Sequence, residues 1–174
     1  KTVLLASGAE HAKLGVPGEE AFAGKGVSYC ATCDGAFFRG KNTAVVGGGD
    51  VALEDAIYLS RICRKVYLIH RRDELRGAKI LQEELKQIPN ITVLYSHAVT
   101  KIQGEDAVEA LVVKDLKTGE ESSLEVSGVF IAVGIHPNTA LLENIAARDE
   151  DGYILAGEDG VTDRPGIFVA GDTR

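Results

Sequence analysis

Three consecutive glycines between a short apolar run and an amphipathic segment constrain the fold of this chain more than any other feature. Residues 43–46 form the apolar run, residues 47–49 are the glycines, and apolar residues then recur at helical spacing from Val51 to Cys63. This pattern predicts a buried strand, a tight turn and a helix. A second apolar run over residues 65–70 predicts the next strand, so the segment forms a strand–helix–strand unit with parallel strands.

The rest of the central region adds one more helix and strands of both kinds. A helix is predicted over residues 78–88, and a third parallel strand over residues 91–95. Hydrophobicity then alternates with a period of two over residues 107–115 and 122–126, on either side of a turn, which indicates an antiparallel meander. A final apolar strand is predicted over residues 128–134. The fold class is therefore α/β, with a Rossmann-like parallel sheet, crossover helices and an antiparallel β-meander.

The two ends of the chain differ from this central region. Residues 1–13 and 137–174 each hold a strand, with a short helix and loops in the second segment, and neither makes a self-sufficient core. We interpret them as two pieces of a second domain that residues 14–136 interrupt. The sequence contains no methionine and its first residues enter a strand directly, so we expect that it has been cut from a longer polypeptide.

The amino-acid composition of the chain argues against some classes of function. Hydrophobic residues make up 45% of the chain and charged residues 26%, which is ordinary for a soluble globular protein. The formal net charge of −7 argues against a nucleic-acid surface, and there is no apolar run of about eighteen residues to predict a membrane span. Two of the three cysteines are separated by two residues, which suits a reducing compartment, so we expect a cytoplasmic protein. The third, Cys63, is interpreted as an inert buried thiol within a helix.

Cys30 and Cys33 form a CxxC pair, the spacing of a redox-active dithiol. Two cysteines at this spacing can close a small disulfide ring, and reduction leaves a thiol that is more acidic than a free cysteine. Asp34 follows directly and is a candidate proton donor or acceptor. A zinc site needs four ligands, and the chain has no second CxxC and no histidine pair at ligand spacing, so no metal site is predicted. A structural disulfide or an idle pair is the remaining alternative.

The glycine turn has the context of a dinucleotide-binding fingerprint, because it follows a predicted strand and opens a predicted helix. Gly47 allows the tight turn, Gly49 lets a pyrophosphate approach the backbone, and Ala52 permits close packing of helix and strand. The helix N-terminus would then face the phosphates. The alternative is a glycine-rich loop that serves geometry only.

A basic cluster stands at the end of the second strand of this unit, where a bound ribose would lie. His70, Arg71 and Arg72, with Arg76 one turn further on, replace the acid that would accept hydrogen bonds from a free 2′-hydroxyl. Guanidinium groups bind phosphate through bidentate, charge-assisted bonds. The cluster therefore favours NADPH, which carries a 2′-phosphate, over NADH. The alternative is a solvated surface on which the acids at positions 73–74 neutralise the arginines.

These motifs together resemble one family. The segments Ser28–Gly35, Gly47–Glu54, His70–Asp73 with Arg76, and Gly134–Thr139 occur in the order and with the residues found in bacterial low-molecular-weight thioredoxin reductases. Peroxiredoxin-reductase flavoproteins share much of the pattern. The resemblance implies a homodimeric flavoenzyme that passes electrons from NADPH through FAD to the CxxC disulfide and on to thioredoxin.

The resemblance also implies roles for individual residues. Cys33 would lie next to the flavin, Cys30 would attack the thioredoxin disulfide, and Asp34 would act as the acid. Residues 14–18 and 134–137 would form a hinge between the NADPH and FAD domains. The implied cofactor positions are, for NADPH, Gly47, Gly48, Gly49, Asp50, Val51, Ala52, Glu54, His70, Arg71, Arg72 and Arg76, and, for the flavin, Asp172.

The chain lacks most of the FAD half of that family. Residues 1–13 and 137–174 would be remnants of the FAD domain, and residues 14–136 would be the NADPH-binding domain that contains the CxxC pair. We therefore do not expect this polypeptide to retain FAD, and catalysis would belong to the intact parent, a thioredoxin-disulfide reductase. Two alternatives stay open: an NADPH-binding module without turnover, and a reductase of a peroxiredoxin or of another small dithiol partner.

Overall fold

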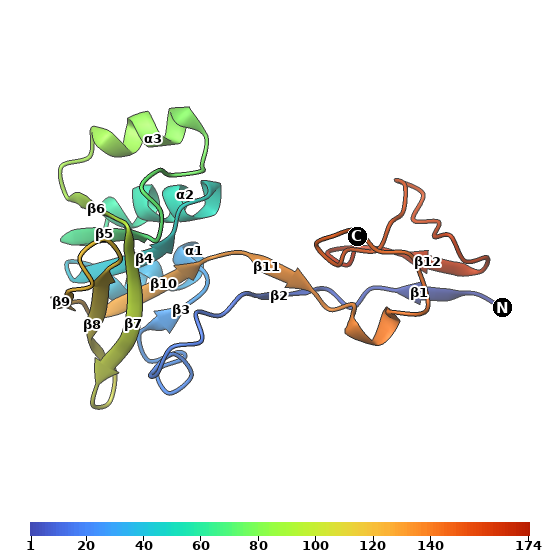
Figure 1. Cartoon of the computed structure of the whole chain (residues 1–174), viewed down its shortest axis with the longest axis horizontal. Coiled ribbons are helices and arrows are strands. Elements are labelled where there is room, and N and C mark those ends of the chain that lie inside the picture. Colours follow the sequence, from blue (N-terminus) through green and yellow to red (C-terminus); the bar gives the residue numbers. More distant parts are fainter. The chain divides into compact units, whose positions relative to one another are not determined.

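The computed structural model describes residues 1–174, apart from the side chain of Leu141. The chain divides into two compact units. Figure 1 colours the whole chain by residue number, from blue at the N-terminus to red at the C-terminus. The central unit comprises Lys13–Val133, and the flanking unit comprises Lys1–Ala12 together with Gly134–Arg174. The assignment of these units to NADPH and FAD stays a prediction.

Five parallel strands form the main sheet of the central unit. They are β3 (Val27–Ser28), β4 (Asn42–Gly47), β5 (Lys65–His70), β6 (Ile91–Tyr95) and β10 (Gly128–Ala132). Their spatial order is β3-β10-β4-β5-β6, and every neighbouring pair is parallel. Helix α2 (Asp50–Ser60) connects β4 to β5, and helix α3 (Lys79–Lys86) connects β5 to β6. The predicted strand–helix–strand arrangement is confirmed.

The second sheet of the central unit is antiparallel. It consists of β7 (His97–Gly104), β8 (Val108–Asp115) and β9 (Glu121–Glu125), with β8 in the middle. The meander predicted from the period-two segments is confirmed in β8 and β9. Strand β7 has no clear alternation, because its register with β8 shifts between Val99 and Lys101 and again after Gln103. The sequence pattern therefore does not mark β7 as a strand.

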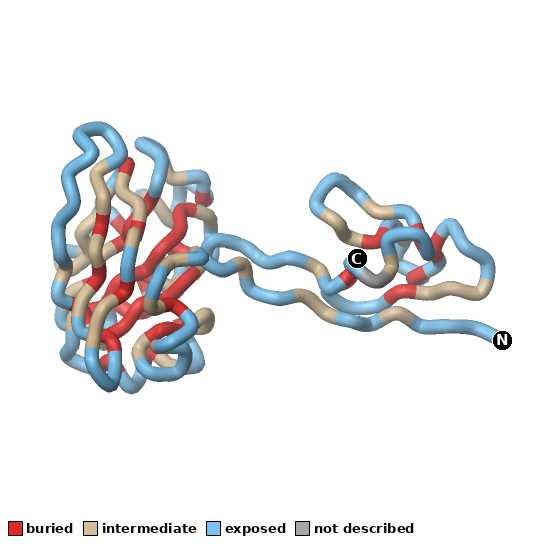
Figure 2. The backbone as a smooth tube through the Cα atoms, turned by 60° about the horizontal axis from the view of Figure 1, so that its bottom comes forward, coloured by how far each residue is buried: buried red, intermediate tan, exposed pale blue. Residues whose placement is uncertain are grey.

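The central unit has three layers. Alternate residues of a strand point to opposite faces of a sheet, so the parallel strands contribute to two separate cores, whose buried residues are red in Figure 2. One core lies against α2 and α3 and the other against the antiparallel sheet. The first core includes Val45, Leu68 and Phe130, and the second includes Val46, Ile69 and Ile131.

Cys63 does not lie within a helix, contrary to the prediction. Helix α2 ends at Ser60, so Cys63 lies in the turn after the helix and not within it. Its thiol is buried as predicted, and burial raises the pKa of Cys63.

At the CxxC pair, α1 (Ala31–Asp34) is followed by the 3-10 turn η1 (Gly35–Phe38). These two elements are too short to show a period in the sequence.

The flanking unit contains two small sheets and the 3-10 turn η2 (Ala140–Leu142). Strands β1 (Val3–Leu5) and β12 (Ile167–Val169) are parallel, and β2 (Ala9–His11) and β11 (Ile135–Pro137) are antiparallel. Its buried core is small and consists of Ala146, Ile154 and Val169 with partly buried neighbours. Across the described residues of both units, no helix is long and apolar enough to cross a membrane.

Candidate functional site

Three of the predicted motifs emerge at one edge of the parallel sheet. Because β3, β10, β4 and β5 are mutually parallel, the residues that follow β3, β4 and β5 lie at the same edge. The CxxC pair follows β3, the glycine turn ends β4, and the arginine cluster follows β5. The carboxyl edge of a parallel sheet is where open α/β folds place their ligands.

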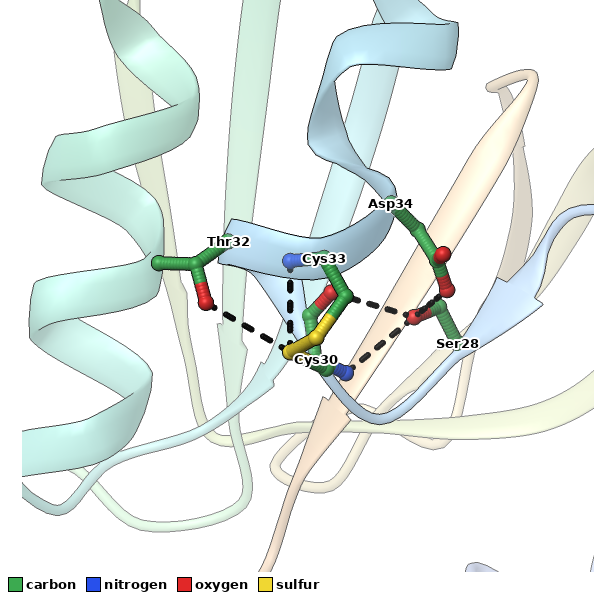
Figure 3. Close-up of a disulfide and its surroundings, with 5 residues drawn as sticks. All are labelled: Ser28, Cys30, Thr32, Cys33 and Asp34. Carbon is green, nitrogen blue, oxygen red and sulfur yellow. Dashed lines mark hydrogen bonds between the residues drawn. A yellow bond between two sulfur atoms is a disulfide. The ribbon is translucent and has the colours of Figure 1, made fainter.

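Cys30 and Cys33 are joined by a disulfide whose sulfur atoms lie 2.04 Å apart and whose Cα atoms lie 5.3 Å apart. Cys30 caps the N-terminus of α1, because the backbone N–H of Cys33 donates to Cys30 Sγ at 3.2 Å (Figure 3). The hydroxyl oxygen of Thr32 lies 3.4 Å from the same sulfur. In the reduced chain, an N–H donor at this position would stabilise negative charge on Cys30. Cys33 is the more exposed of the two cysteines.

Ser28 links the backbone of Cys30 to the carboxylate of Asp34. The backbone N–H of Cys30 donates to Ser28 Oγ at 3.1 Å, and the Ser28 hydroxyl donates to Asp34 Oδ2 at 2.6 Å (Figure 3). Ser28 is buried and ends β3. The carboxylate of Asp34 is therefore held in a fixed position close to the dithiol by a hydroxyl that belongs to the sheet.

Close packing anchors α1 and η1 on the rest of the central unit. A Cβ at Gly35 would lie 3.0 Å from Leu59 Cδ2 and 3.1 Å from Tyr58 Cε1, so this segment packs tightly against α2. The ring of Phe38 packs edge-to-face on Phe130 of β10, with ring centroids 5.4 Å apart. Such a pair contributes about 1 kcal/mol beyond the burial of its surface. The dithiol is therefore carried by a well-supported segment.

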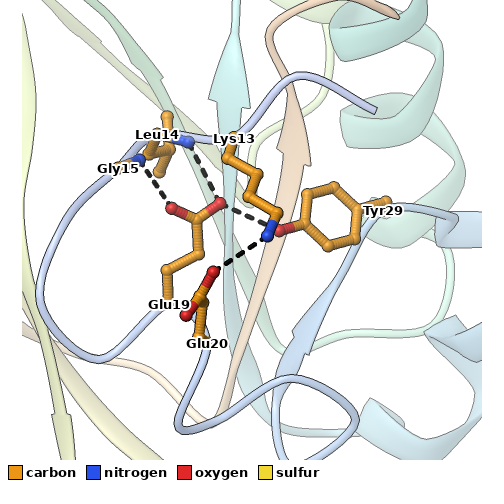
Figure 4. A network of polar contacts seen from close by, with 6 residues as sticks. All are labelled: Lys13, Leu14, Gly15, Glu19, Glu20 and Tyr29. Atoms are coloured by element: carbon orange, nitrogen blue, oxygen red, sulfur yellow. Dashed lines mark hydrogen bonds and ion pairs between the residues drawn. The ribbon is translucent and has the colours of Figure 1, made fainter. Parts of the chain in front are cut away.

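Glu19 is a buried carboxylate that ties the first loop of the central unit to Tyr29, the residue before Cys30. It is 1% exposed. Glu19 Oε1 accepts hydrogen bonds from the Tyr29 hydroxyl at 2.9 Å and from Leu14 N–H at 3.0 Å (Figure 4). Glu19 Oε2 accepts from Gly15 N–H at 2.7 Å. Burial and the Glu19 carboxylate raise the pKa of Tyr29 to about 12, so its hydroxyl stays protonated and donates.

The predicted hinge segment, residues 14–18, is restrained by these bonds and by strand β7. Ile102 N–H donates to the carbonyl of Pro17 at 2.9 Å. A Cβ at Gly18 would overlap the carbonyl oxygen of Ile102, at a position where φ is +93°. A movement within residues 14–18 therefore has to break bonds inside the central unit, and the role of this segment as a hinge stays a prediction.

We expect Glu19→Ala to lower the free energy of unfolding by about 3 kcal/mol, because three donors lose their buried acceptor. Urea unfolding followed by circular dichroism measures the change. Glu20→Ala is the matched control, since Glu20 is exposed and pairs at the surface with Lys13 at 2.9 Å, so stability should change little. Equal effects of the two substitutions would contradict a special role for Glu19.

The glycine turn has the close approaches and the open face that a pyrophosphate requires. A Cβ at Gly47 would overlap the carbonyl oxygen of Ala132 and lie 2.7 Å from the Cβ of Ala52. A Cβ at Gly49 would meet nothing within 4 Å, so the backbone is open to a ligand there. Gly49 is also the N-cap of α2, and no described side chain caps this end of the helix. Free N–H groups at a helix N-terminus favour an anion.

His70 lies beneath the glycine turn, apart from the exposed cations. It is 4% exposed, and a Cβ at Gly48 would overlap its ring. Burial, together with the charges of Arg76 and Arg72, lowers the pKa of His70, so its ring is neutral at pH 7. Its Nε2 is buried and has no hydrogen-bond partner among the described residues. His70 therefore contributes packing and an unpaired nitrogen rather than a positive charge.

The three arginines of the cluster, in contrast, present their charges to solvent. Arg71, Arg72 and Arg76 are exposed. The ion pairs in the described part of the chain involve other residues, so the acids at positions 73–74 form no ion pair with these arginines. The guanidinium groups are therefore available to a phosphate, and the residues at this edge fit a 2′-phosphorylated dinucleotide.

Helix α2 also carries a half-buried acid, and we expect Asp55→Asn to stabilise the chain above pH 6. Burial, reinforced by Glu54, raises the pKa of Asp55 to about 6. A raised carboxyl pKa means that the folded state loses stability as the pH rises from about 4 to about 6. Because solvent screens this partly exposed group, we expect a gain of about 1 kcal/mol at pH 7.5.

Urea unfolding at pH 4 and at pH 7.5 tests this expectation for Asp55. The advantage of Asp55→Asn should disappear at the lower pH, where the wild-type carboxyl is already protonated in the folded state. Glu83→Gln on the exposed face of α3 is the control and should change stability equally little at both values. An advantage of the same size at both pH values would show that desolvation of the carboxylate is not its cause.

Three further predicted site residues are exposed. Val51 and Glu54 are exposed on α2, beyond the glycine turn. Asp172 is exposed and belongs to the flanking unit. Sequence reasoning also misses Ser28 and Glu19. For Ser28 the available signal is a hydroxyl two residues before a CxxC pair, whereas no local signal distinguishes Glu19 from an ordinary surface acid.

Known proteins match this chain over its whole length. The family model of the pyridine nucleotide-disulphide oxidoreductases matches residues 1–174. The chain belongs to the pyridine nucleotide-disulphide oxidoreductase family.

Its relatives within that family include thioredoxin reductases. The chain is 47% identical to the thioredoxin reductase of Mycolicibacterium smegmatis and 46% identical to that of Treponema pallidum, in each case over 173 residues, 99% of this chain and 56% of the relative. A crystal structure of Lactococcus lactis thioredoxin reductase matches with a TM-score of 0.90 at 40% identity, over 100% of this chain and 58% of that one. The chain therefore spans a little over half the length of these relatives. The resemblance inferred from the motifs is confirmed.

Proposed function

We propose that this chain is the NADPH-binding and redox-dithiol part of a thioredoxin-disulfide reductase. In the longer enzyme, electrons would pass from NADPH through FAD to the Cys30–Cys33 disulfide and then to thioredoxin. Thioredoxin reductases are among the relatives that match the chain. The resemblance further leads us to propose that the parent is a cytoplasmic homodimer.

One observation carries this proposal: a disulfide-forming cysteine pair and a glycine turn at the start of a helix lie at the same edge of one sheet. The glycine turn ends β4, and Cys30 follows β3, which is separated from β4 by β10 alone. A purely structural disulfide has no need of this neighbourhood. A dinucleotide-binding module without turnover has no need of the dithiol or of the carboxylate that Ser28 holds beside it.

The residues of the central unit have separate tasks in this proposal. The open backbone at Gly49 and the N-terminus of α2 would hold the pyrophosphate, and Arg71, Arg72 and Arg76 would hold the 2′-phosphate. When bound, NADPH supplies a hydride and FAD relays its two electrons. Asp172 is the position of this chain that we propose contacts the flavin, with the other contacts supplied by the longer parent.

The dithiol would act by thiol–disulfide exchange. The reduced Cys30 thiolate, stabilised by the N–H of Cys33, would attack a sulfur of the thioredoxin disulfide and release one thiolate. The Cys33 thiolate would then attack Cys30 Sγ, which re-forms the internal disulfide and releases the second thiol of thioredoxin. Asp34, held by Ser28, would take up the proton that Cys30 loses when its thiolate forms and pass it to a departing thiolate.

A calorimetric titration of the chain with NADPH and with NADH tests the cofactor assignment. We expect NADPH to bind at least about tenfold more tightly, because the arginines gain charge-assisted bonds that only a 2′-phosphate provides. Flavin absorbance recorded before the titration shows whether the sample already carries FAD. Equal affinity for the two dinucleotides, or binding of neither, would overturn the assignment of this edge to NADPH.

A further inference from the structure

The loop that carries the exposed arginines is tied by three backbone donors to the glycine turn and to the first residue of α2. The N–H groups of Arg76 and Gly77 both donate to the carbonyl oxygen of Gly48, at 2.7 Å and 3.0 Å. The next N–H, that of Ala78, donates to Asp50 Oδ1 at 2.6 Å. The loop therefore cannot shift along the edge of the sheet without breaking bonds to the turn that would hold the pyrophosphate.

Asp50 supplies the one side chain among these three bonds. It is the first residue of α2, where a negative charge is favoured by the helix dipole. A Cβ at Gly77 would lie 3.2 Å from Asp50 Oδ1 and 2.9 Å from Leu53 Cδ2, so the loop packs closely against the start of α2. Asp50 Oδ1 is thus committed to the loop.

The other end of the loop is fixed as well. The N–H of Ser96 donates to the carbonyl of Arg72 at 2.9 Å. Ser96 is buried and has a φ of 55°, the left-handed conformation that residues other than glycine rarely adopt. The Gln82 side chain also donates to the carbonyl of Gly77 at 2.7 Å. With both ends held, the contact of Asp50 fixes the side of the loop nearest to the glycine turn.

We propose that Asp50 is a positioning residue that sets the distance between the arginine loop and the glycine turn, and so determines selectivity for a 2′-phosphorylated dinucleotide. The inference rests on the proposed function. The pyrophosphate and the 2′-phosphate of one ligand are joined through a single ribose, which limits the distance between them, so both are bound best if turn and loop keep their spacing. NADH, which lacks the 2′-phosphate, makes no use of that spacing.

Binding of NADPH and NADH to Asp50→Ala and Asp50→Asn tests the selectivity. Asp50→Ala removes the acceptor, and we expect NADPH affinity to fall about tenfold while NADH affinity changes less than about twofold. Asp50→Asn removes the charge but keeps an acceptor oxygen for Ala78 N–H, so it should retain most of the preference for NADPH. Glu83→Ala removes one negative charge from the exposed face of α3 and is the control for charge alone.

Hydrogen exchange of the unliganded variants tests the positioning directly. Amides in a peptide spanning residues 72–80 should exchange faster in Asp50→Ala and at the wild-type rate in Asp50→Asn. Equal losses of NADPH and NADH affinity, an Asp50→Asn variant that behaves like Asp50→Ala, or unchanged exchange would overturn the inference. If the wild-type chain shows no preference for NADPH, both the proposed function and the role of Asp50 in selectivity fail. Hydrogen exchange then still shows whether Asp50 holds the loop in place.

Discussion

The reduced chain carrying Cys33→Ser is expected to attack a small aromatic disulfide through Cys30 and then to stall as a mixed disulfide. In this step the Cys30 thiolate bonds to one sulfur of the reagent and the other sulfur leaves as a thiolate. In the wild-type chain the Cys33 thiolate next attacks Cys30 Sγ, so the second half of the reagent leaves and the internal disulfide re-forms. The wild-type chain should therefore release both halves of the reagent, and the variant only one.

The converse variant, Cys30→Ser, is expected to react at least about tenfold more slowly than Cys33→Ser. The difference follows from the contacts of the sulfur atoms, because the N–H of Cys33 and the hydroxyl of Thr32 lie close to Cys30 Sγ and stabilise its thiolate. Absorbance of the released thiolate gives the rates, and mass spectrometry locates the adduct. Cys63→Ser is the control and should react like wild type, since Cys63 is buried. Equal rates for the two variants would contradict the assignment of Cys30 as the attacking thiol.

The fold around the glycine turn can be predicted from the sequence because its determinants are local. The strand, the turn and the start of the helix lie within residues 42–60, and the side-chain periods change at the glycines. The spacing of Gly47 and Ala52 even predicts their close packing, and in the structure a Cβ at Gly47 would lie only 2.7 Å from the Cβ of Ala52. Strand β3, with only two residues, and the bulged β7 give no such signal.

Much of the candidate site cannot be predicted from the sequence, because it depends on side chains that the fold brings together. Glu19 looks like one more acid in a polar loop, and its burial follows from donors at Leu14, Gly15 and Tyr29 that converge in three dimensions. His70 stands in a run of cations, yet the close approach of Gly48 buries its ring. In both cases the neighbouring residues in the sequence predict an exposed side chain, whereas packing in the folded chain buries it.

Replacing both Arg71 and Arg72 by alanine is expected to weaken NADPH binding about 100-fold or more and to leave NADH binding within about threefold. Each hydrogen bond to a charged group contributes about 1.5 to 3 kcal/mol, and about 1.4 kcal/mol corresponds to a factor of ten in affinity. Both guanidinium groups are exposed and form no ion pair with another described residue, so they lose no internal partner when a phosphate binds. Their contribution to NADPH binding should therefore be close to its full value.

The double variant Arg39→Ala/Lys41→Ala distinguishes specific recognition from the overall charge of the chain. It removes two positive charges from exposed positions of the same unit, at the end of η1 and before β4. If net charge alone attracted the dinucleotide, this variant and Arg71→Ala/Arg72→Ala would weaken NADPH to the same extent and would weaken NADH as well. We expect the control to bind both dinucleotides nearly as wild type does. Calorimetry at two salt concentrations separates the cases, because general attraction is screened at higher ionic strength while a bidentate guanidinium–phosphate contact keeps the preference for NADPH.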